Sequence, residues 1–263
     1  MSAITTTDRV SLDRRVPAAG GLNPTFVRIE IKRLMRNKRT VIFTLLMPAV
    51  FFLLFGLSNK DQHLPNGQSY GGYILISLAV YGAMTAATAA GSMVAVERAL
   101  GWSRQLRLTP LQPAAYIAVK AISSLSLALL SVVTEFLVGA AFGIRMEWQI
   151  WLVAGLVAWL GSLTFAALGL FMGYLVPSAN VMQLLGPILA VLAMLGGLFV
   201  PISVMGKTFG DIAKFVPTYG LGQLARSPLT GDFDWMWIVN VVVWLAVFTI
   251  GSALAFRRDT KRV

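Results

Sequence analysis

Long apolar runs separated by short polar stretches make up most of the sequence. About 20 consecutive apolar residues, each rising about 1.5 Å along a helix, are needed to cross the hydrocarbon core of a bilayer. Suitable runs lie near residues 41–57, 72–96, 114–143, 148–176, 181–201 and 235–256. A tight turn of sequence Pro-Ser-Ala-Asn separates the fourth run from the fifth. The pattern therefore predicts an all-α integral membrane protein with six transmembrane helices.

The segment before the first apolar run is patterned differently. Residues 1–22 are polar and weakly periodic, which favours a disordered cytoplasmic tail. Asn23 and Pro24 form a typical helix start, with Asn as the N-cap and Pro at the first helical position. From 24 to 39 an apolar face runs beside a basic one, the former made of Val27, Ile31, Leu34 and Met35 and the latter of Arg28, Lys32, Arg36 and Arg39. We predict an amphipathic helix in the plane of the membrane interface.

Composition and charge agree with a membrane protein. The chain is 57% hydrophobic and 13% charged, whereas soluble domains are typically about 45–50% apolar and about 25% charged. Most of its 22 Lys and Arg residues fall before the first run or at alternate ends of later runs. The positive-inside rule then places both termini in the cytoplasm and the protein in the cell membrane. Because the basic residues flank apolar runs and do not alternate with aromatics, the net charge of +11 does not predict a nucleic-acid partner.

The sequence lacks the residues that several kinds of chemistry require. The chain has no cysteine and a single histidine, His63, so we expect no metal site and no cofactor bound by this chain. A Gly-x-x-x-x-Gly-Lys-Ser/Thr phosphate loop is also absent from the sequence. We therefore predict that the chain is not an enzyme and hydrolyses no ATP on its own.

The inner loop after the second run has the most distinctive sequence. It reads Glu-Arg-Ala-Leu-Gly-Trp-Ser-Arg-Gln-Leu-Arg-Leu-Thr-Pro-Leu-Gln-Pro over residues 97–113, with charged and apolar residues between Gly and Pro breaks. This combination favours a short amphipathic helix projecting into the cytoplasm, while the simpler interpretation is that its basic residues only set the topology.

The same loop resembles the signature loop of ABC-2-type permeases, the membrane halves of ABC exporters. The matching residues are Glu97, Arg98, Gly101, Leu106, Arg107, Thr109, Pro110 and Leu111. A second resemblance follows in order, with Gly-Gly-Leu-Phe-Val-Pro-Ile at 196–202 and Phe-Val-Pro-Thr-Tyr-Gly at 215–220. Together the two segments place the resemblance between about residue 24 and the C-terminus.

The resemblance implies both an architecture and a set of partners. The chain would be the permease subunit of an ATP-driven exporter, assembled with two copies of a separate ABC ATPase and with a second permease copy or a paralogue. ATP and Mg would bind the ATPase. The loop would be a coupling helix that contacts the ATPase through Glu97, Arg98, Gly101, Arg104, Leu106, Arg107 and Pro110. Residues 204–234 would fold back as short outer re-entrant helices.

Candidate pathway residues carry alternative interpretations. Glu135 is the one acidic residue deep in a predicted span, and it either contacts cargo or packs in a hydrogen-bonded form. Thr85 and Thr88 belong to a run of small residues that favours close helix packing over a polar pathway. Met194 and Phe199 flank a Gly-Gly pair, which suggests either an apolar constriction or a simple helix end. These residue types favour an apolar or amphipathic, drug- or lipid-like cargo, while the resemblance leaves polysaccharide export as an alternative, since the family also includes polysaccharide exporters.

Other classes of function fit less well. An ion-coupled secondary transporter needs buried ionisable residues to carry the ion, and only Glu135 qualifies in the predicted spans' interior. A membrane scaffold gives no role to the punctuated inner loop, and a membrane enzyme would need a nucleophile–base or metal constellation that the sequence does not suggest.

Overall fold

The computed structural model describes residues 18–64, 66–102, 105 and 111–261, and all of its regular elements are helical. Small residues, proline breaks and capping side chains mark where these helices begin and end. In chain order they are η1 (Ala18–Gly21), α1 (Pro24–Arg36), α2 (Lys38–Phe51), η2 (Phe52–Gly56), η3 (Leu57–Asn59), α3 (Tyr70–Ser92), α4 (Val94–Ala99), α6 (Pro113–Ala141), α7 (Trp148–Gly161), α8 (Leu163–Leu175), α9 (Ser178–Leu195), η4 (Ile202–Val204), α10 (Lys207–Ala213), α11 (Pro217–Thr230) and α12 (Trp235–Lys261).

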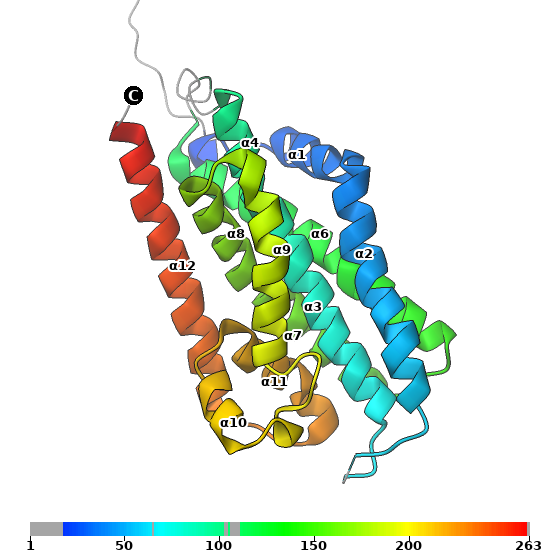
Figure 1. Cartoon of the computed structure of the whole chain (residues 1–263). Helices are drawn as coiled ribbons and strands as arrows, with labels where there is room; N and C mark the ends of the chain where they lie inside the picture. The colour runs from blue at the N-terminus through cyan, green and yellow to red at the C-terminus, as the bar shows by residue number, and fades with distance from the viewer. Residues whose placement is uncertain (1–17, 65, 103–104, 106–110, 262–263) are drawn as a thin grey trace, which may run out of the picture.

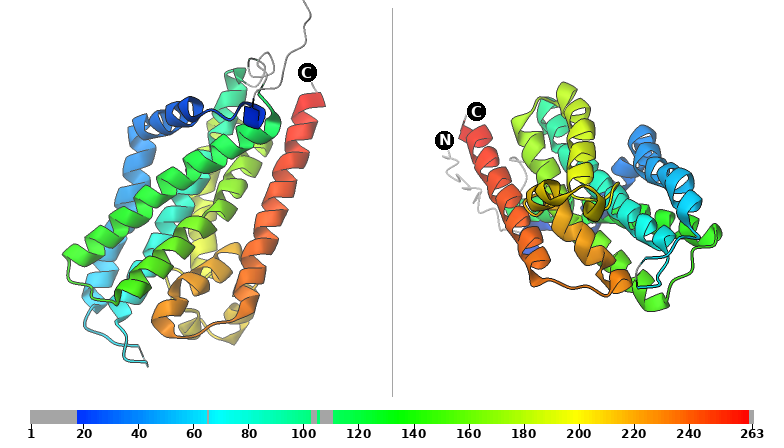
Figure 2. Two further views of the ribbon diagram at one scale, coloured as in Figure 1. Left: turned by 180° about the vertical axis from the view of Figure 1, so that it is seen from behind. Right: turned by 60° about the horizontal axis from the view of Figure 1, so that its bottom comes forward.

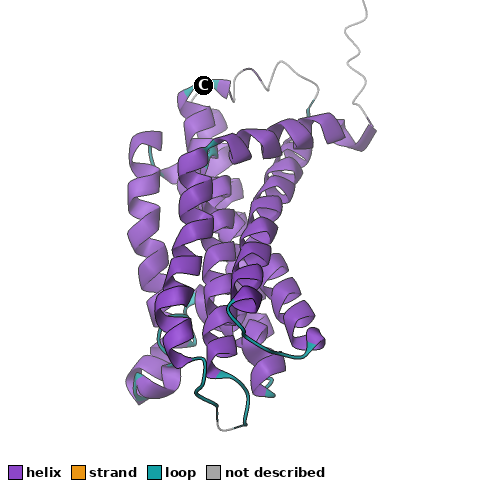
Figure 3. Cartoon of the chain, turned by 90° about the vertical axis from the view of Figure 1, so that its right-hand side faces the viewer, coloured by secondary structure: helices purple, strands orange, loops and turns teal. Residues whose placement is uncertain are grey.

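The long helices run side by side as a bundle, and α1 lies crosswise at one end (Figure 1; Figure 3). The C-terminal end of α12 lies at the same end as α1 and α4, while α10 and α11 lie at the opposite end (Figure 2). Two local features differ from the predicted elements. Asn37 separates α1 from α2, so the amphipathic helix ends at Arg36 and not at residue 39. Residues 18–21 form a 3-10 turn where the sequence favoured a continuing tail, and Gly20 accepts a hydrogen bond from the backbone of Gln112.

Five stretches of the described chain are long and apolar enough to cross a membrane: Thr40–Asn59, Tyr70–Ala99, Ala114–Ala141, Trp148–Leu175 and Trp235–Arg258. They correspond to five of the six predicted spans, and they make this a multi-pass membrane protein. The remaining prediction falls on α9, whose apolar part, Gln183–Leu195, is shorter. At about 1.5 Å per residue, the 18 residues of α9 extend about 27 Å against a hydrocarbon core of about 30 Å, so the sixth crossing stays a prediction.

Helix α3 forms the centre of the bundle and contacts α2, α6, α7, α8, α9 and α11. Of the residues in its most apolar window 83% are buried, compared with 6% of those in the corresponding window of α12 at the periphery. Glycine makes this central position possible. A Cβ atom on Gly91 would lie 2.4 Å from the carbonyl oxygen of Ala166, and one on Gly169 would lie 2.3 Å from that of Thr88. The backbones of α3 and α8 therefore touch directly, as small residues permit in membrane helices.

Helix α2 is interrupted in the middle of its span. Pro48 lies inside the helix and has no N–H to give to the carbonyl of Thr44, four residues earlier. The hydroxyl of Ser131 on α6 donates to that carbonyl at 3.3 Å. The chain then continues into the π-helical segment η2. A side chain from the neighbouring helix thus satisfies the backbone group that proline releases, as required where water is absent.

Candidate functional site

The buried face of α1 carries a charge as well as apolar groups. Asn23 caps the helix by accepting a hydrogen bond from the backbone of Thr25 at 2.8 Å, and Pro24 opens the first turn. The two buried side chains of α1 are Glu30 and Leu34, which lie four residues apart and therefore on one face. Glu30 is thus held against the bundle, where an ionised carboxylate needs a partner.

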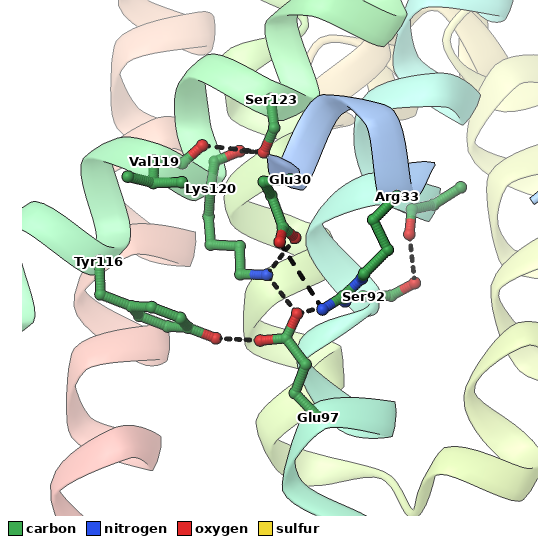
Figure 4. A network of polar contacts seen from close by, with 9 residues as sticks. Glu30, Arg33, Ser92, Glu97, Tyr116, Val119, Lys120 and Ser123 are labelled. Atoms are coloured by element: carbon green, nitrogen blue, oxygen red, sulfur yellow. Dashed lines mark hydrogen bonds and ion pairs between the residues drawn. The ribbon is translucent and has the colours of Figure 1, made fainter. Parts of the chain in front are cut away.

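That partner belongs to a cluster of charged groups at which α1, α4 and α6 meet. Lys120 of α6 donates to Glu30 with Nζ and Oε1 2.5 Å apart, and it also donates to Glu97 of α4. Glu97 accepts further hydrogen bonds from Arg33 of α1 and from the hydroxyl of Tyr116 on α6. Figure 4 shows these side chains converging from the three helices. We call Glu30, Arg33, Glu97, Tyr116 and Lys120 the inner charge cluster.

The inner charge cluster is electrically balanced and mostly buried. It contains two carboxylates and two cations, and Glu30, Glu97 and Lys120 are each exposed by 3% or less. Arg33 is the outermost member, since about a third of its side chain is exposed. Desolvating such groups is costly, and removing one partner of a buried ion pair typically costs about 3–5 kcal/mol because the other charge is left uncompensated. The cluster therefore holds the three helices in one arrangement.

Arg98, the residue after Glu97 on α4, contacts a different helix. Its Nη1 atom donates to the backbone carbonyls of Gly173 and Tyr174, at 3.0 and 2.9 Å, at the end of α8. The guanidinium carbon also lies 5.6 Å from the centre of the Tyr174 ring. Adjacent residues Glu97 and Arg98 thus connect α4 to α1, α6 and α8.

The chain leaves the bundle directly after α4. Gly101 has a φ of +71°, a backbone conformation that glycine adopts without strain. The remaining predicted ATPase-contact residues, Arg104, Leu106, Arg107 and Pro110, lie outside the described residues. The structure therefore brings Glu97 and Arg98 together at the root of the loop, and contact with an ATPase stays a prediction for all of them.

Most of the inner charge cluster was missed by sequence reasoning. Sequence reasoning uses the basic residues that flank the runs, Lys120 among them, only as a topology signal, and it gives Glu30 no role. One signal could have found Lys120, because a cation one to two turns inside an otherwise apolar run normally has a specific partner. Glu30 lies next to the apolar face defined by Val27, Ile31 and Leu34, so helical geometry alone placed it near the buried side.

The pathway candidates occupy different environments. Thr88 is fully buried between α3 and α8, where its hydroxyl donates to the carbonyl of Met84 at 2.7 Å and approaches that of Phe165 at 3.2 Å. This placement favours the packing interpretation for Thr88. Thr85 is half-buried and donates to the carbonyl of Gly82 within its own helix. Met194 is 51% exposed, so it reaches the surface of the bundle.

Phe199 belongs to an aromatic group with residues of α2 and α3. Its ring lies 4.8 Å from that of Tyr81 and 6.1 Å from that of Phe51, both in edge-to-face geometry. Phe199 itself is 38% exposed. Three rings from α2, α3 and the turn after α9 thus form a partly open aromatic patch.

Glu135 is an acidic side chain enclosed within the bundle. It is 1% exposed, and neither carboxylate oxygen has a hydrogen-bond partner among the described residues. Its neighbours one helical turn away, Ser131 and Gly139, face α3, since added Cβ atoms on Gly82 and Gly139 would meet Ser131 and Leu75. Glu135 therefore lies in the seam between α3 and α6. The described residues bring together no group of three or more His, Cys, Asp or Glu suited to a metal ion.

Comparison with known proteins identifies the family of this bundle. The family model of the ABC-2 type transporter matches residues 24–229, from the first residue of α1 into α11. Over 236 residues the chain is also 28% identical to "Putative transport permease YvfS" of Bacillus subtilis (strain 168), covering 88% of this chain and 95% of that protein. The family match spans well over half of the chain and includes the inner charge cluster and the aromatic patch. The chain belongs to the ABC-2 type transporter family, and it is the transmembrane component of an ABC transporter and not its ATPase.

Proposed function

We propose that this chain is the permease subunit of an exporter that moves an apolar or amphipathic, drug- or lipid-like molecule out of the cell. The observation that carries this proposal is the inner charge cluster. Helix α4 directly precedes residues 100–112, the segment that would contact the ATPase. Glu97 and Arg98 connect α4 to α1, α6 and α8. A displacement of the loop would therefore reach three helices through buried, charge-assisted contacts.

The proposed orientation in the membrane follows from the residues at the end of the bundle that holds the inner charge cluster. The inner charge cluster and the basic residues of α1 would face the cytoplasm, together with both termini. Helices α10 and α11 would then lie outside as the re-entrant segment. Trp235 and Trp237 begin α12 at that end, where tryptophan is expected at a membrane interface. In this arrangement α9 provides the sixth crossing, because it connects the inner end of α8 to the outer segment.

The pathway would form between two permease copies. Helix α9 exposes Gln183 and Gly186 in its inner half and Met194 in its outer half. Small and polar residues at helical spacing suit close helix–helix contact within a bilayer. Two such faces, each continued by the aromatic patch at Phe199, would enclose an apolar route with a constriction near its outer end. Thr85 and Glu135 remain candidates for polar contacts with cargo, and Thr88 remains a weaker one.

Transport by inside-out vesicles tests the proposal directly. The chain is co-expressed with a candidate ABC ATPase from the same genome, and uptake of rhodamine 6G, an amphipathic dye, is followed with and without ATP. We expect uptake that needs both proteins and ATP, while the purified permease alone hydrolyses no ATP. Charge reversal at Arg107 should abolish uptake or ATPase binding, whereas the same change at Lys32, an exposed cation of α1, should not.

Two results would contradict the proposal. Equal uptake by the Arg107 and Lys32 variants would leave the loop without a coupling role. Uptake driven by a proton or sodium gradient without ATP would support the ion-coupled alternative, for which the structural argument is the buried carboxyl of Glu135, without a hydrogen-bond partner among the described residues.

A further inference from the structure

Arg226 is the largest fully buried side chain in the described part of the protein. It lies on α11, in the segment that follows the fifth apolar run, and its sequence context gives no sign of burial. Burial lowers the pKa of its guanidinium, yet a guanidinium keeps its proton at any physiological pH. Arg226 is therefore a permanent cation enclosed by protein at the end of the bundle opposite the inner charge cluster.

The guanidinium contacts three separate parts of the chain. Nη1 donates to the hydroxyl of Ser77 on α3 at 2.9 Å and to the carbonyl of Gly197 at 3.0 Å. Nη2 donates to the side chain of Gln223 at 2.7 Å, one turn earlier on α11. The ring of Tyr73 lies beneath the group, with its centre 4.7 Å from the guanidinium carbon. Arg226 thus joins α11 both to the central helix and to the turn that ends α9.

Neutral groups alone hold this cation among the described residues. The ion pairs found there involve other side chains, and Nε of Arg226 has no hydrogen-bond partner. A buried charge held by dipoles and a ring, without a carboxylate, is bound less tightly than one in an ion pair. Its contacts can therefore be exchanged for water at a lower cost than those of the inner charge cluster.

The contact with Gly197 controls where the following residues lie. Gly197 has a φ of +76°, so it turns the chain sharply after α9 and points its carbonyl at Arg226. Leu198 is buried directly after it, and Phe199 then reaches the rings of Tyr81 and Phe51. Gly222 leaves the space for this arrangement, since an added Cβ would lie 2.7 Å from Leu198 and 3.2 Å from Nη2 of Arg226.

We propose that Arg226 is a positioning residue for the outer constriction: it holds the Gly197 turn and α11 against α3, and it must release the Gly197 carbonyl for the outer end of the pathway to open. This inference rests on the proposed function for the assignment of Phe199 to the pathway. To the proposed function the inference adds Arg226 as the group that keeps the constriction closed. While both bonds are made, the Gly197 turn and α11 are held together against α3, because the one side chain of Arg226 binds Gly197 and Ser77.

The absence of cysteine allows a direct measurement in the whole chain. A single cysteine replaces buried Leu198, and a membrane-impermeant thiol reagent is added from the outside. In the otherwise native background we expect slow labelling, because position 198 is closed off. Arg226→Gln should raise the labelling rate by about tenfold or more, and Ser77→Ala should raise it less, since each loses hydrogen bonds to a charged donor. Arg226→Lys should fall between native and Gln, because it keeps the charge but loses the planar fork.

Lys214→Gln is the matched control, since Lys214 is an exposed cation in the same outer segment and pairs only with Asp211 among the described residues. It should label at the native rate. If Arg226→Gln does not fold, as judged by its elution and thermal unfolding, Ser77→Ala carries the test. Native labelling rates in a folded Arg226→Gln or in Ser77→Ala would overturn the inference. Labelling needs neither ATP nor cargo, so this result is independent of whether the chain exports rhodamine 6G.

Discussion

Replacing Lys120 with methionine removes the cation on which the inner charge cluster depends. The substitution keeps an unbranched, flexible side chain of similar length, so loss of charge is the main change. Among the described residues, Glu30 then keeps only a long contact with Arg33, in which the charged atoms are 3.6 Å apart. Glu97 keeps its hydrogen bonds from Arg33 and Tyr116. Two buried carboxylates would thus share a single, partly exposed cation.

The expected cost follows from that imbalance. Leaving a buried charge uncompensated typically destabilises a protein by about 3–5 kcal/mol. Domains are generally stable by about 5–15 kcal/mol, so Lys120→Met should lower the thermal unfolding temperature markedly. Glu30→Gln added to Lys120→Met removes one of the two stranded carboxylates. This double variant should recover a large part of the lost stability, which a simple packing defect at position 120 would not allow.

Thermal unfolding in detergent measures the effect on stability, and ATP-driven dye uptake with the ATPase partner measures the effect on transport. Lys32→Met is the control, because it removes an exposed cation from α1 without touching the inner charge cluster. We expect Lys32→Met to behave as native. If Lys120→Met unfolds at the same temperature as Lys32→Met and transports equally well, the cluster contributes neither stability nor coupling. If the double variant is less stable than Lys120→Met, the charge-balance reasoning is wrong.

Three further outcomes are expected. Gly169→Ala should destabilise the fold by forcing apart the backbones of α3 and α8, whereas Gly210→Ala on α10, whose added Cβ would meet the Ile202 side chain at an ordinary 3.4 Å, should be neutral or stabilising in thermal unfolding. Glu135→Met should raise the unfolding temperature, because it removes a buried polar group that has no hydrogen-bond partner among the described residues and so costs about 1–3 kcal/mol. It should also reduce dye uptake if that carboxyl meets cargo. A lower unfolding temperature would refute the expected gain in stability. A single cysteine at Ser58 should react with an impermeant reagent added to intact cells, and one at Ser103 should not; the reverse pattern would invert the proposed orientation.

Apolar run lengths anticipated the helices well, because a span must satisfy its own backbone and so needs about 20 apolar residues. The charge pairs were not anticipated, since Glu30, Glu97 and Lys120 are 23 to 90 residues apart and meet only after three helices pack. Arg226 was missed for the same reason. Its partners Ser77 and Gly197 are 149 and 29 residues away, and a basic residue near an apolar run is usually a membrane flank.

The glycine positions show a similar limit to what the sequence predicts about helix packing. A row of small residues in 82–92 favoured close packing, and that interpretation agrees with the direct contact of α3 with α8. The identity of the partner helix could not be obtained from the row itself, because any two small-residue faces can approach. The motif at 97–111 located the root of the loop, where Glu97 and Arg98 lie, but family resemblance and not periodicity singled it out.

The peripheral position of α12 has a consequence for how the membrane itself stabilises this protein. Only 6% of the residues in its most apolar window are buried, so much of its 24-residue apolar stretch faces lipid tails, while one side packs against α8 and α11. At about 1.5 Å per residue the stretch is about 36 Å long, some 6 Å more than an average hydrocarbon core of about 30 Å. Hydrophobic mismatch of this size is relieved by tilting or by local thickening of the bilayer. Acyl-chain length should therefore set the tilt of α12, and through Asn240 and Trp244, which bond to the carbonyls of Lys214 and Phe215, that tilt reaches the outer segment.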